Sequence, residues 1–186
     1  MFQPTKAGPV TWEALRGDLL QIPKETLVDM ISMWIQNYWA CQSYWVTFVE
    51  RDYGLKAATD MDGEVFEKTA RIQAKKLRQT LGLKDDMQAL AFVLKHTTPQ
   101  WVPAGFSWEF TEVEDDHIAL RVRECPMGTF RKGQGLELFP CKNISQPLYT
   151  ALAKAVNPKM RAVCTHAHPD APKEGVNCEW RFEYEA

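Results

Sequence analysis

The sequence lacks several features that mark membrane, secreted or nucleic-acid-binding proteins. No apolar run approaches the roughly 18 residues that a membrane-spanning helix needs, and the first residues lack the apolar core of a signal peptide. A net charge of −2 leaves no basic excess that would attract nucleic acid or an anionic membrane. We therefore expect a cytoplasmic protein that has neither of these partners.

Motifs for nucleotide and structural zinc sites are also missing. The glycines at positions 128, 133 and 135 fit neither a Walker loop nor a G-x-G-x-x-G turn, and no C-x-x-C pair occurs. The chain has five cysteines, an odd number, and thiols stay reduced in the cytoplasm. The cysteines therefore indicate core residues, metal ligands or reactive thiols rather than disulfides.

The first half of the chain carries helical patterns. Apolar spacing predicts one long helix from Pro23 to Gly54, a second from about residue 56 or 60 to Leu81, and a third over 85–96. Residues 1–23 are predicted to be an N-terminal arm with a short helical turn around 12–15. The inward positions expected on the second helix are Val65, Phe66, Thr69, Ile72, Leu77 and Leu81.

The second half of the chain changes period. Alternating apolar residues predict a β-hairpin over about 106–123 and further strands at 159–166 and 177–184. Residues 125–147 are rich in glycine and proline and are predicted to form a long irregular connection, with a helix from Pro147 to Val156. Helices followed by antiparallel strands predict an α+β fold, in which the N-terminal helices pack on one face of a C-terminal four-stranded antiparallel sheet. Residues 24–186 then form a single ligand-binding domain.

Three cysteines follow strands or loops and could converge at one end of this sheet. Cys125, Cys141 and Cys178 together would suit zinc or an iron–sulfur cluster with one open position. Cys125 could instead be a nucleophile whose pKa is lowered by a nearby arginine, Arg123 or Arg131. The catalytic candidates are therefore Glu124, as a general base beside the thiol, and Cys125 itself.

The remaining cysteines and the histidines have simpler interpretations. Cys41, on the apolar face of the first long helix, and Cys164, within a strand, are predicted to be core residues. His166 and His168 lie on the same face of an extended segment, where they could form a metal pair or simply belong to a solvated loop. His117 is expected to be a solvated turn residue.

The first long helix is the other candidate for function. Its aromatic residues are dense enough to cover more than one face, and rings with a few polar groups are the usual lining of a small-molecule pocket. Trp45 and Glu50 are the residues of this helix that we expect at the pocket. Glu50 could alternatively form an ion pair with Arg51 or Lys56.

Several of these segments also resemble a known group of proteins. The residues are Trp45-x-x-x-Val49-Glu50-x-x-Tyr53-Gly54, Ala57, Cys125-Pro126, Cys141, Asn157-Pro158-Lys159 and Cys178-x-Trp180-x-Phe182. Together they are similar to an uncharacterised family of prokaryotic cytosolic proteins that looks like L-2-amino-thiazoline-4-carboxylic acid hydrolases, and more remotely like 4-vinyl reductase type small-molecule-binding domains. The resemblance implies an α+β ligand-binding fold with cysteines gathered at a pocket.

Three functions remain open at this point. The first is a metal- or iron–sulfur-binding protein that acts as a hydrolase or lyase on a small sulfur- or nitrogen-containing acid. The second is a non-catalytic sensor or accessory domain that binds a small apolar ligand. The third is a homo-oligomer or a subunit of a larger complex, with the first long helix as its interface.

Overall fold

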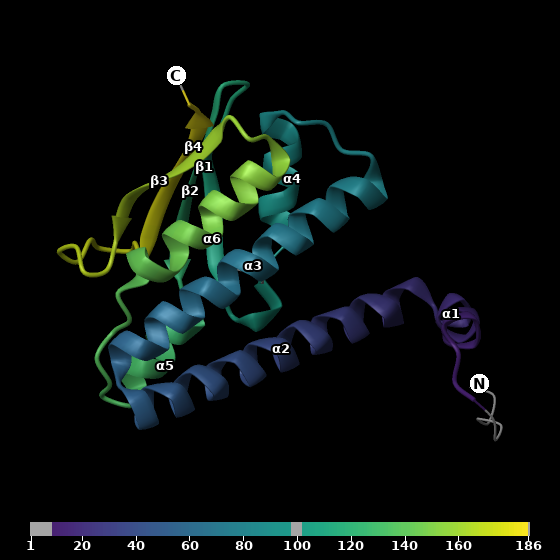
Figure 1. The fold of residues 1–186 in the computed structure, drawn as a ribbon, viewed down its shortest axis with the longest axis horizontal. Coiled ribbons are helices and arrows are strands. Elements are labelled where there is room, and N and C mark those ends of the chain that lie inside the picture. Colours follow the sequence, from purple (N-terminus) through teal and green to yellow (C-terminus); the bar gives the residue numbers. More distant parts are fainter. Residues whose placement is uncertain (1–8, 98–101, 186) are drawn as a thin grey trace.

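A computed structural model describes residues 9–97 and 102–185. The predicted α+β architecture is confirmed, with helices mostly first and an antiparallel sheet afterwards (Figure 1). The described helices are α1 (Trp12–Gln21), α2 (Lys24–Tyr53), α3 (Leu55–Leu81), α4 (Met87–His96), the short 3-10 turn η1 (Val102–Ala104), α5 (Pro126–Gly133) and α6 (Cys141–Val156). The described strands are β1 (Ser107–Val113), β2 (His117–Glu124), β3 (Met160–Ala167) and β4 (Cys178–Tyr184).

The sheet has the strand order β1-β2-β4-β3, and every neighbouring pair is antiparallel. Its inner face carries the apolar positions of the two central strands, such as Leu120, Trp180 and Phe182, each no more than 1% exposed. Helices α6 and α4 contact this face directly, whereas α3 packs on the outer side of α6 and α2 packs on α3 (Figure 1). The helices therefore form more than one layer over a single face of the sheet.

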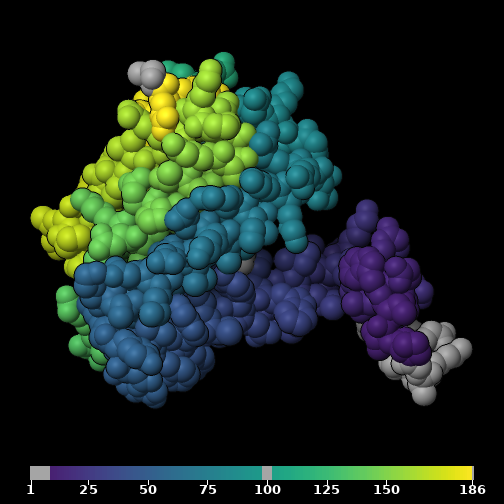
Figure 2. Space-filling model, in the orientation of Figure 1, coloured from purple at the N-terminus to yellow at the C-terminus, as the bar shows by residue number. Residues whose placement is uncertain are grey.

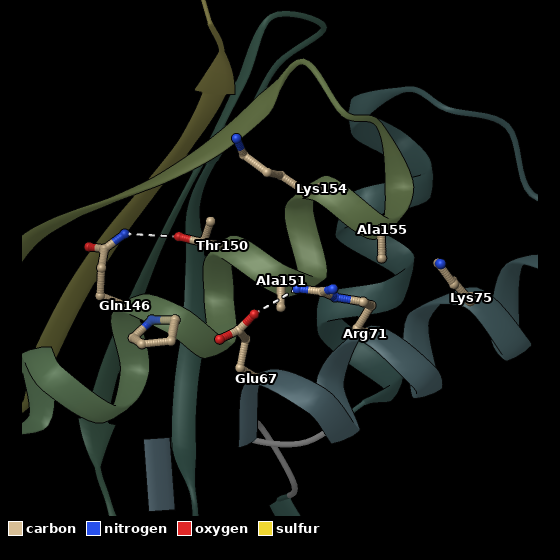
Figure 3. Close-up of a pocket in the computed structure, with 9 residues that line it drawn as sticks. Glu67, Arg71, Lys75, Gln146, Thr150, Ala151, Lys154 and Ala155 are labelled. Atoms are coloured by element: carbon tan, nitrogen blue, oxygen red, sulfur yellow. Dashed lines mark hydrogen bonds and ion pairs between the residues drawn. The ribbon is translucent and has the colours of Figure 1, made fainter. Parts of the chain in front are cut away.

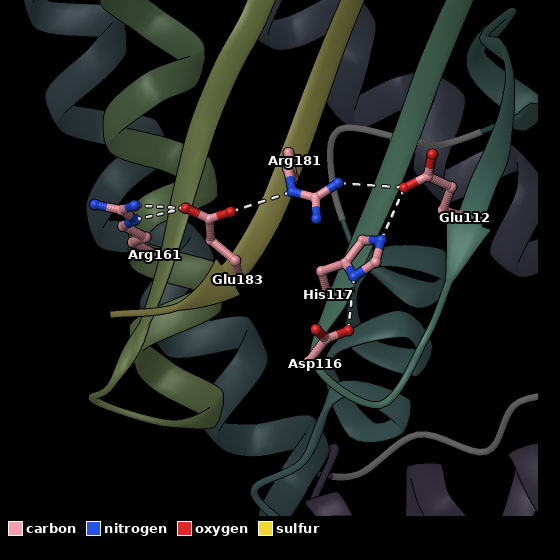
Figure 4. Close-up of polar contacts among 6 residues, drawn as sticks. All are labelled: Glu112, Asp116, His117, Arg161, Arg181 and Glu183. Atoms are coloured by element: carbon pink, nitrogen blue, oxygen red, sulfur yellow. Dashed lines mark hydrogen bonds and ion pairs between the residues drawn. The ribbon is translucent and has the colours of Figure 1, made fainter. Parts of the chain in front are cut away.

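The outer face of the sheet carries charged side chains that form ion pairs with one another. Figure 4 shows a chain of ion pairs across the strands, in which Arg181 contacts Glu183 at 3.1 Å and Glu112 at 3.2 Å. His117, expected to be solvated, instead bonds Glu112 at 2.8 Å and Asp116 at 2.7 Å. These carboxylates raise the pKa of His117. The charges on this face therefore find partners among themselves.

Helix α3 presents small residues, rather than its large apolar ones, to α6. Phe66 is buried as expected, but Val65 and Ile72 are exposed, and the inner positions are Ala70 and Ala74. At Gly63 a methyl group would lie 3.2 Å from the Asn143 carbonyl oxygen, so the two helix backbones approach closely there. The expected inward set was therefore wrong at Val65, Ile72 and Leu81, which are exposed, whereas Leu77 packs partly buried against the core. Alanine and glycine allow a close approach of the helices that larger side chains would prevent.

The glycine- and proline-rich segment after β2 is largely helical, contrary to expectation. It contains α5, and α6 begins at Cys141 rather than at Pro147, which lies inside the helix. Pro126 occupies the first turn of α5, where the missing N–H has no helical partner to lose. The prediction failed because these prolines were taken as signs of a loop or of the start of a helix.

The N-terminal arm is a longer helix than predicted, and it stands apart from the body. No residue of α1 is buried, and Figure 2 shows it at the far end of α2, away from the sheet. Apolar side chains along α1 and the first half of α2 are exposed, including Trp12 (63%), Leu20 (67%) and Trp34 (63%). Only Gln42 and Val46 of α2 are buried. None of the described helices combines the length and apolar character needed to cross a bilayer.

Candidate functional site

A cavity of about 90 Å³ lies where α2, α3 and α6 meet one end of the sheet. Most of its walls are apolar, and most of the side chains that form them are buried. It is lined by Trp39, Gln42, Asp62, Phe66, Phe106, Val122, Cys125, Met127, Phe139, Cys141, Ile144, Ser145, Leu148, Tyr149, Asn177 and Cys178. A space of this size can hold a few waters or a compact organic molecule.

The fold brings the three predicted cysteines to this cavity. Cys125 precedes α5, Cys141 is the first residue of α6, and Cys178 is the first residue of β4. Residues 122 and 178 pair directly across β2 and β4, which places the two strand ends side by side. All three side chains line the same space, although they come from distant parts of the sequence.

The cavity thiols are held in their neutral form. The pKa values of Cys141 and of Cys178 are raised to about 12, mainly by burial and in smaller part by the neighbouring thiols. Burial also raises the pKa of Cys125. Neither Arg123 nor Arg131 activates Cys125 as expected, because Arg123 pairs with Glu109 and Arg131 with Glu50. Because the neutral thiol is a weak nucleophile, this environment suits apolar packing better than covalent chemistry.

The expected metal centre has no support in the arrangement of the described residues. Among residues 9–97 and 102–185, no three His, Cys, Asp or Glu side chains are grouped so that they could hold a metal ion. The three thiols line one space, but a ligand set for zinc or an iron–sulfur cluster stays a prediction.

The polar end of the cavity was not anticipated from the sequence. Gln42, on α2, donates from Nε2 to Oδ1 of Asp62, on α3, over 2.6 Å. Both side chains are buried, with 9% and 3% of their surface exposed. The amide oxygen of Gln42, Oε1, is buried without a hydrogen-bond partner among the described residues, and so is Nε1 of Trp39. An unpaired acceptor and an unpaired donor therefore occur in residues that line one space.

Burial also changes the protonation of Asp62. Loss of solvent raises the pKa of this carboxyl to about 7, and the hydrogen bond from Gln42 only partly offsets the effect. Near neutral pH the group can therefore hold a proton, and it acts then as a donor as well as an acceptor.

The other predicted site residues lie outside the cavity. Glu124 is exposed at the end of β2 and does not line the cavity. Trp45 is 39% exposed and does not line the cavity. Cys41 is also exposed, contrary to the core position expected for it, whereas Cys164 is half-buried.

Glu50 is part of a buried ion pair, although not with either of the partners considered for it. Its carboxylate contacts Arg131, on α5, and Arg131 is only 1% exposed. The guanidinium also lies 3.9 Å from the ring centre of Phe139, a cavity residue. Glu50 therefore supports the wall of the cavity rather than facing into it.

The two histidines considered as a metal pair have separate partners. The ring Nδ1 of His168 lies 2.8 Å from the carbonyl oxygen of Phe139, to which it donates. The ring Nδ1 of His166 lies 4.0 Å from Oδ2 of Asp170. The hydrogen bond of His168 joins the loop after β3 to the segment that leads into α6.

A larger hollow lies on the outer side of α3 and α6, as Figure 3 shows, with a volume of about 570 Å³. Most of its charged side chains already have partners: Arg71 contacts Glu67 at 2.6 Å, and Lys154 contacts Glu185 at 3.0 Å. It opens to solvent and lacks buried polar atoms without partners among the described residues. The smaller inner cavity is therefore the better candidate site.

The spacing of residues on α2 could have indicated that Trp39 and Gln42 face the site. Trp39, Gln42 and Val46 lie three and four positions apart, so they share one helix face. This is the face that turns inward, and a glutamine there would need a buried partner. Asp62 lies one turn before Phe66 on α3, again among inward positions. The sequence does not show that the two polar residues face each other.

The fold and the cavity together define an α+β domain with an apolar internal site that has one polar end. The chain belongs to the family of unknown function DUF6125, which matches residues 20–184. A search of curated proteins found no match.

Among solved structures, the chain is similar to the phenol-responsive sensory domain of the transcription activator PoxR, determined with phenol. The TM-score is 0.54 at 13% sequence identity, and the match covers 78% of this chain and 73% of that one. A likeness at this identity establishes a shared fold.

Proposed function

We propose that this protein is a small-molecule-binding domain of the sensory or accessory type. It takes a compact, largely apolar ligand into the cavity between α2, α3, α6 and the sheet. The observation that carries this proposal is the cavity itself, in which apolar walls surround buried polar atoms that have no partner in the described chain. Apolar sites with a few convergent polar groups are the usual form of small-molecule sites.

The structural neighbour supports the same conclusion. That domain responds to phenol, a single ring with one polar group, and its fold is similar to this one. A cavity of about 90 Å³ lined by several aromatic rings is suited to a ligand of comparable size. We therefore place the ligand at or below the size of one six-membered ring.

A hydrolase or lyase has less support from the site. Such a reaction needs an activated water or nucleophile, and Glu124, the candidate base, is exposed and does not line the cavity. The pKa of each cavity thiol is raised by burial, which works against a thiolate nucleophile. The described residues form no metal-binding group that could polarise a substrate. Binding without turnover is therefore the function we propose.

The test is a titration with single-ring compounds, followed by tryptophan fluorescence and by calorimetry. We expect saturable binding of at least one of phenol, toluene and cyclohexanol, with a Kd between about 1 μM and 1 mM, as is reasonable for so few atoms. Incubation of the bound compound with the protein should return it unchanged. Conversion of the compound would contradict a non-catalytic role.

A matched pair of variants locates the site. Cys141→Phe adds a ring to the cavity wall and should abolish binding, whereas Cys164→Phe adds the same ring at a half-buried position outside the cavity. Circular dichroism confirms that both variants fold. Equal binding by both variants would place the ligand elsewhere.

A further inference from the structure

We propose that Trp39, Gln42 and Asp62 select ligands that carry a hydroxyl group on a small apolar body. This inference rests on the proposed function and assigns the chemistry that the cavity recognises. The three residues are called the polar pole below. Each lines the cavity, and Trp39 and Gln42 each carry a buried polar atom without a partner among the described residues.

The pole offers an unpaired donor and an unpaired acceptor. Nε1 of Trp39 is a donor without a partner among the described residues, and Oε1 of Gln42 is an acceptor in the same position. They lie three residues apart on α2, so both project from one face of the helix. Asp62 accepts from the amide of Gln42 and has further capacity as an acceptor.

A hydroxyl group satisfies both unpaired atoms at once. Its oxygen can accept from Trp39, and its proton can be donated to the side-chain oxygen of Gln42. A hydrocarbon would leave both groups buried and unsatisfied, which disfavours its binding. Because neither group finds a partner in the described chain, the ligand is the natural source of both hydrogen bonds.

Charged ligands fit the pole poorly. A carboxylate can only accept, so it would face the acceptor Oε1 of Gln42 while losing its water. The cavity lining contains no Lys, Arg or His that could compensate its negative charge. An ammonium group can only donate, so it would leave the indole N–H of Trp39 unpaired while also losing its water.

The walls beside the pole determine the body of the ligand. Trp39 packs against Phe66 and Phe106, with ring centres 6.1 Å and 5.1 Å apart. These rings, together with Val122 and Leu148, form an apolar wall beside the pole. Rings favour edge-to-face or offset contacts with a further ring. The expected ligand is therefore an alcohol or a phenol with a single ring.

The experiment compares four compounds of similar shape at pH 6. Benzyl alcohol is the probe with a hydroxyl, ethylbenzene is its hydrocarbon counterpart, and benzylammonium and benzoate are the charged ones. We expect benzyl alcohol to bind at least about fivefold more tightly than each of the others, because each of them leaves a buried polar group unpaired. Affinities are measured by calorimetry on the full chain.

Variants assign this preference to the pole. Gln42→Leu keeps the volume of the side chain but removes its oxygen, and Trp39→Phe removes the indole N–H. Both should reduce the preference for benzyl alcohol over ethylbenzene to less than about twofold. Phe139→Leu alters an apolar wall of the same cavity and should weaken both compounds equally, which leaves the preference intact.

The outcomes separate this inference from the proposed function. Equal binding of benzyl alcohol and ethylbenzene would overturn the inference while the proposed function stands. A preference that survives in Gln42→Leu and in Trp39→Phe would overturn the assignment to the pole. Binding of neither compound, nor of the single-ring compounds tested above, would overturn both proposals.

Discussion

The Arg131 guanidinium and the Glu50 carboxylate face each other edge to edge and join α5 to the end of α2. Nη1 lies 2.5 Å from Oε2, and Nη2 lies 2.9 Å from Oε1. Nε of Arg131 donates to the carbonyl oxygen of Glu137, in the connection that leads to α6. The same guanidinium covers the ring of Phe139. A single buried side chain therefore anchors the connection that closes one side of the cavity.

Breaking this ion pair should strongly destabilise the fold. Glu50→Gln removes the charge that compensates Arg131, so we expect a loss of about 3–5 kcal/mol in the free energy of unfolding. Asp52→Asn is the matched control, because Asp52 forms an exposed pair with Arg51. It should change stability by less than about 1 kcal/mol. Urea denaturation measures both, and equal effects would show that Glu50 is not an anchor.

The buried carboxyl of Asp62 should make stability depend on pH. The pKa of Asp62 is raised from 3.8 to about 7 in the folded chain, so the folded state holds a proton that the unfolded chain releases. The contribution of this group therefore favours folding below about pH 4 and is lost as pH rises to about 7. The loss is at most about 4 kcal/mol.

Asp62→Asn isolates this effect from other titrating groups. The amide retains an oxygen that can accept from Gln42, but it cannot ionise. We expect the variant to be more stable than the parent at pH 8 and similar to it at pH 4, measured by urea denaturation at each pH. If the difference in free energy of unfolding between variant and parent were the same at every pH, Asp62 would have an ordinary pKa.

The cysteines should differ in how fast they react with a thiol reagent, with one reacting quickly and the others slowly. Cys41 is exposed, whereas burial raises the pKa of Cys141 and Cys178 to about 12 and so keeps both protonated at pH 7. Because the thiolate is the reactive form, a thiol reagent should modify Cys41 first. Cys41→Ser should remove the fast phase. Rapid labelling of the cavity thiols in that variant would contradict their assigned environment.

Purified protein should contain little bound zinc or iron. The described residues include no group of three His, Cys, Asp or Glu side chains that could hold a metal ion. Elemental analysis after purification without oxygen should give far less than one equivalent of either metal. A full equivalent that disappears in Cys178→Ser would overturn this expectation and restore the metal centre predicted from the sequence.

The role of the exposed first half of α2 stays a prediction. The sequence indicated the first long helix as an interface for a second copy or for a larger complex. Apolar side chains along it, such as Val28 and Trp34, are exposed in the single chain. Sedimentation of the full chain and of Trp34→Gln tests whether this surface holds copies together.

Local patterns in the sequence were sufficient for the architecture. The helical spacing before residue 97, the alternation after residue 105 and the glycines that end α2 and α3 all concern neighbours along the chain. They determined the order of helices and strands and the α+β class. Even the meeting of Cys125, Cys141 and Cys178 could be predicted, because each cysteine lies at the start or end of an element.

Only the tertiary structure decided the protonation and the contacts of the residues at the site. Burial, not sequence spacing, keeps the thiols protonated and gives Asp62 its raised pKa. The contacts of Gln42 with Asp62 and of Glu50 with Arg131 join positions that are far apart in the chain. Desolvation and long-range pairing depend on which helices pack together. For that reason the sequence by itself determined a fold and a place for a site, while the packing determined the chemistry of that site.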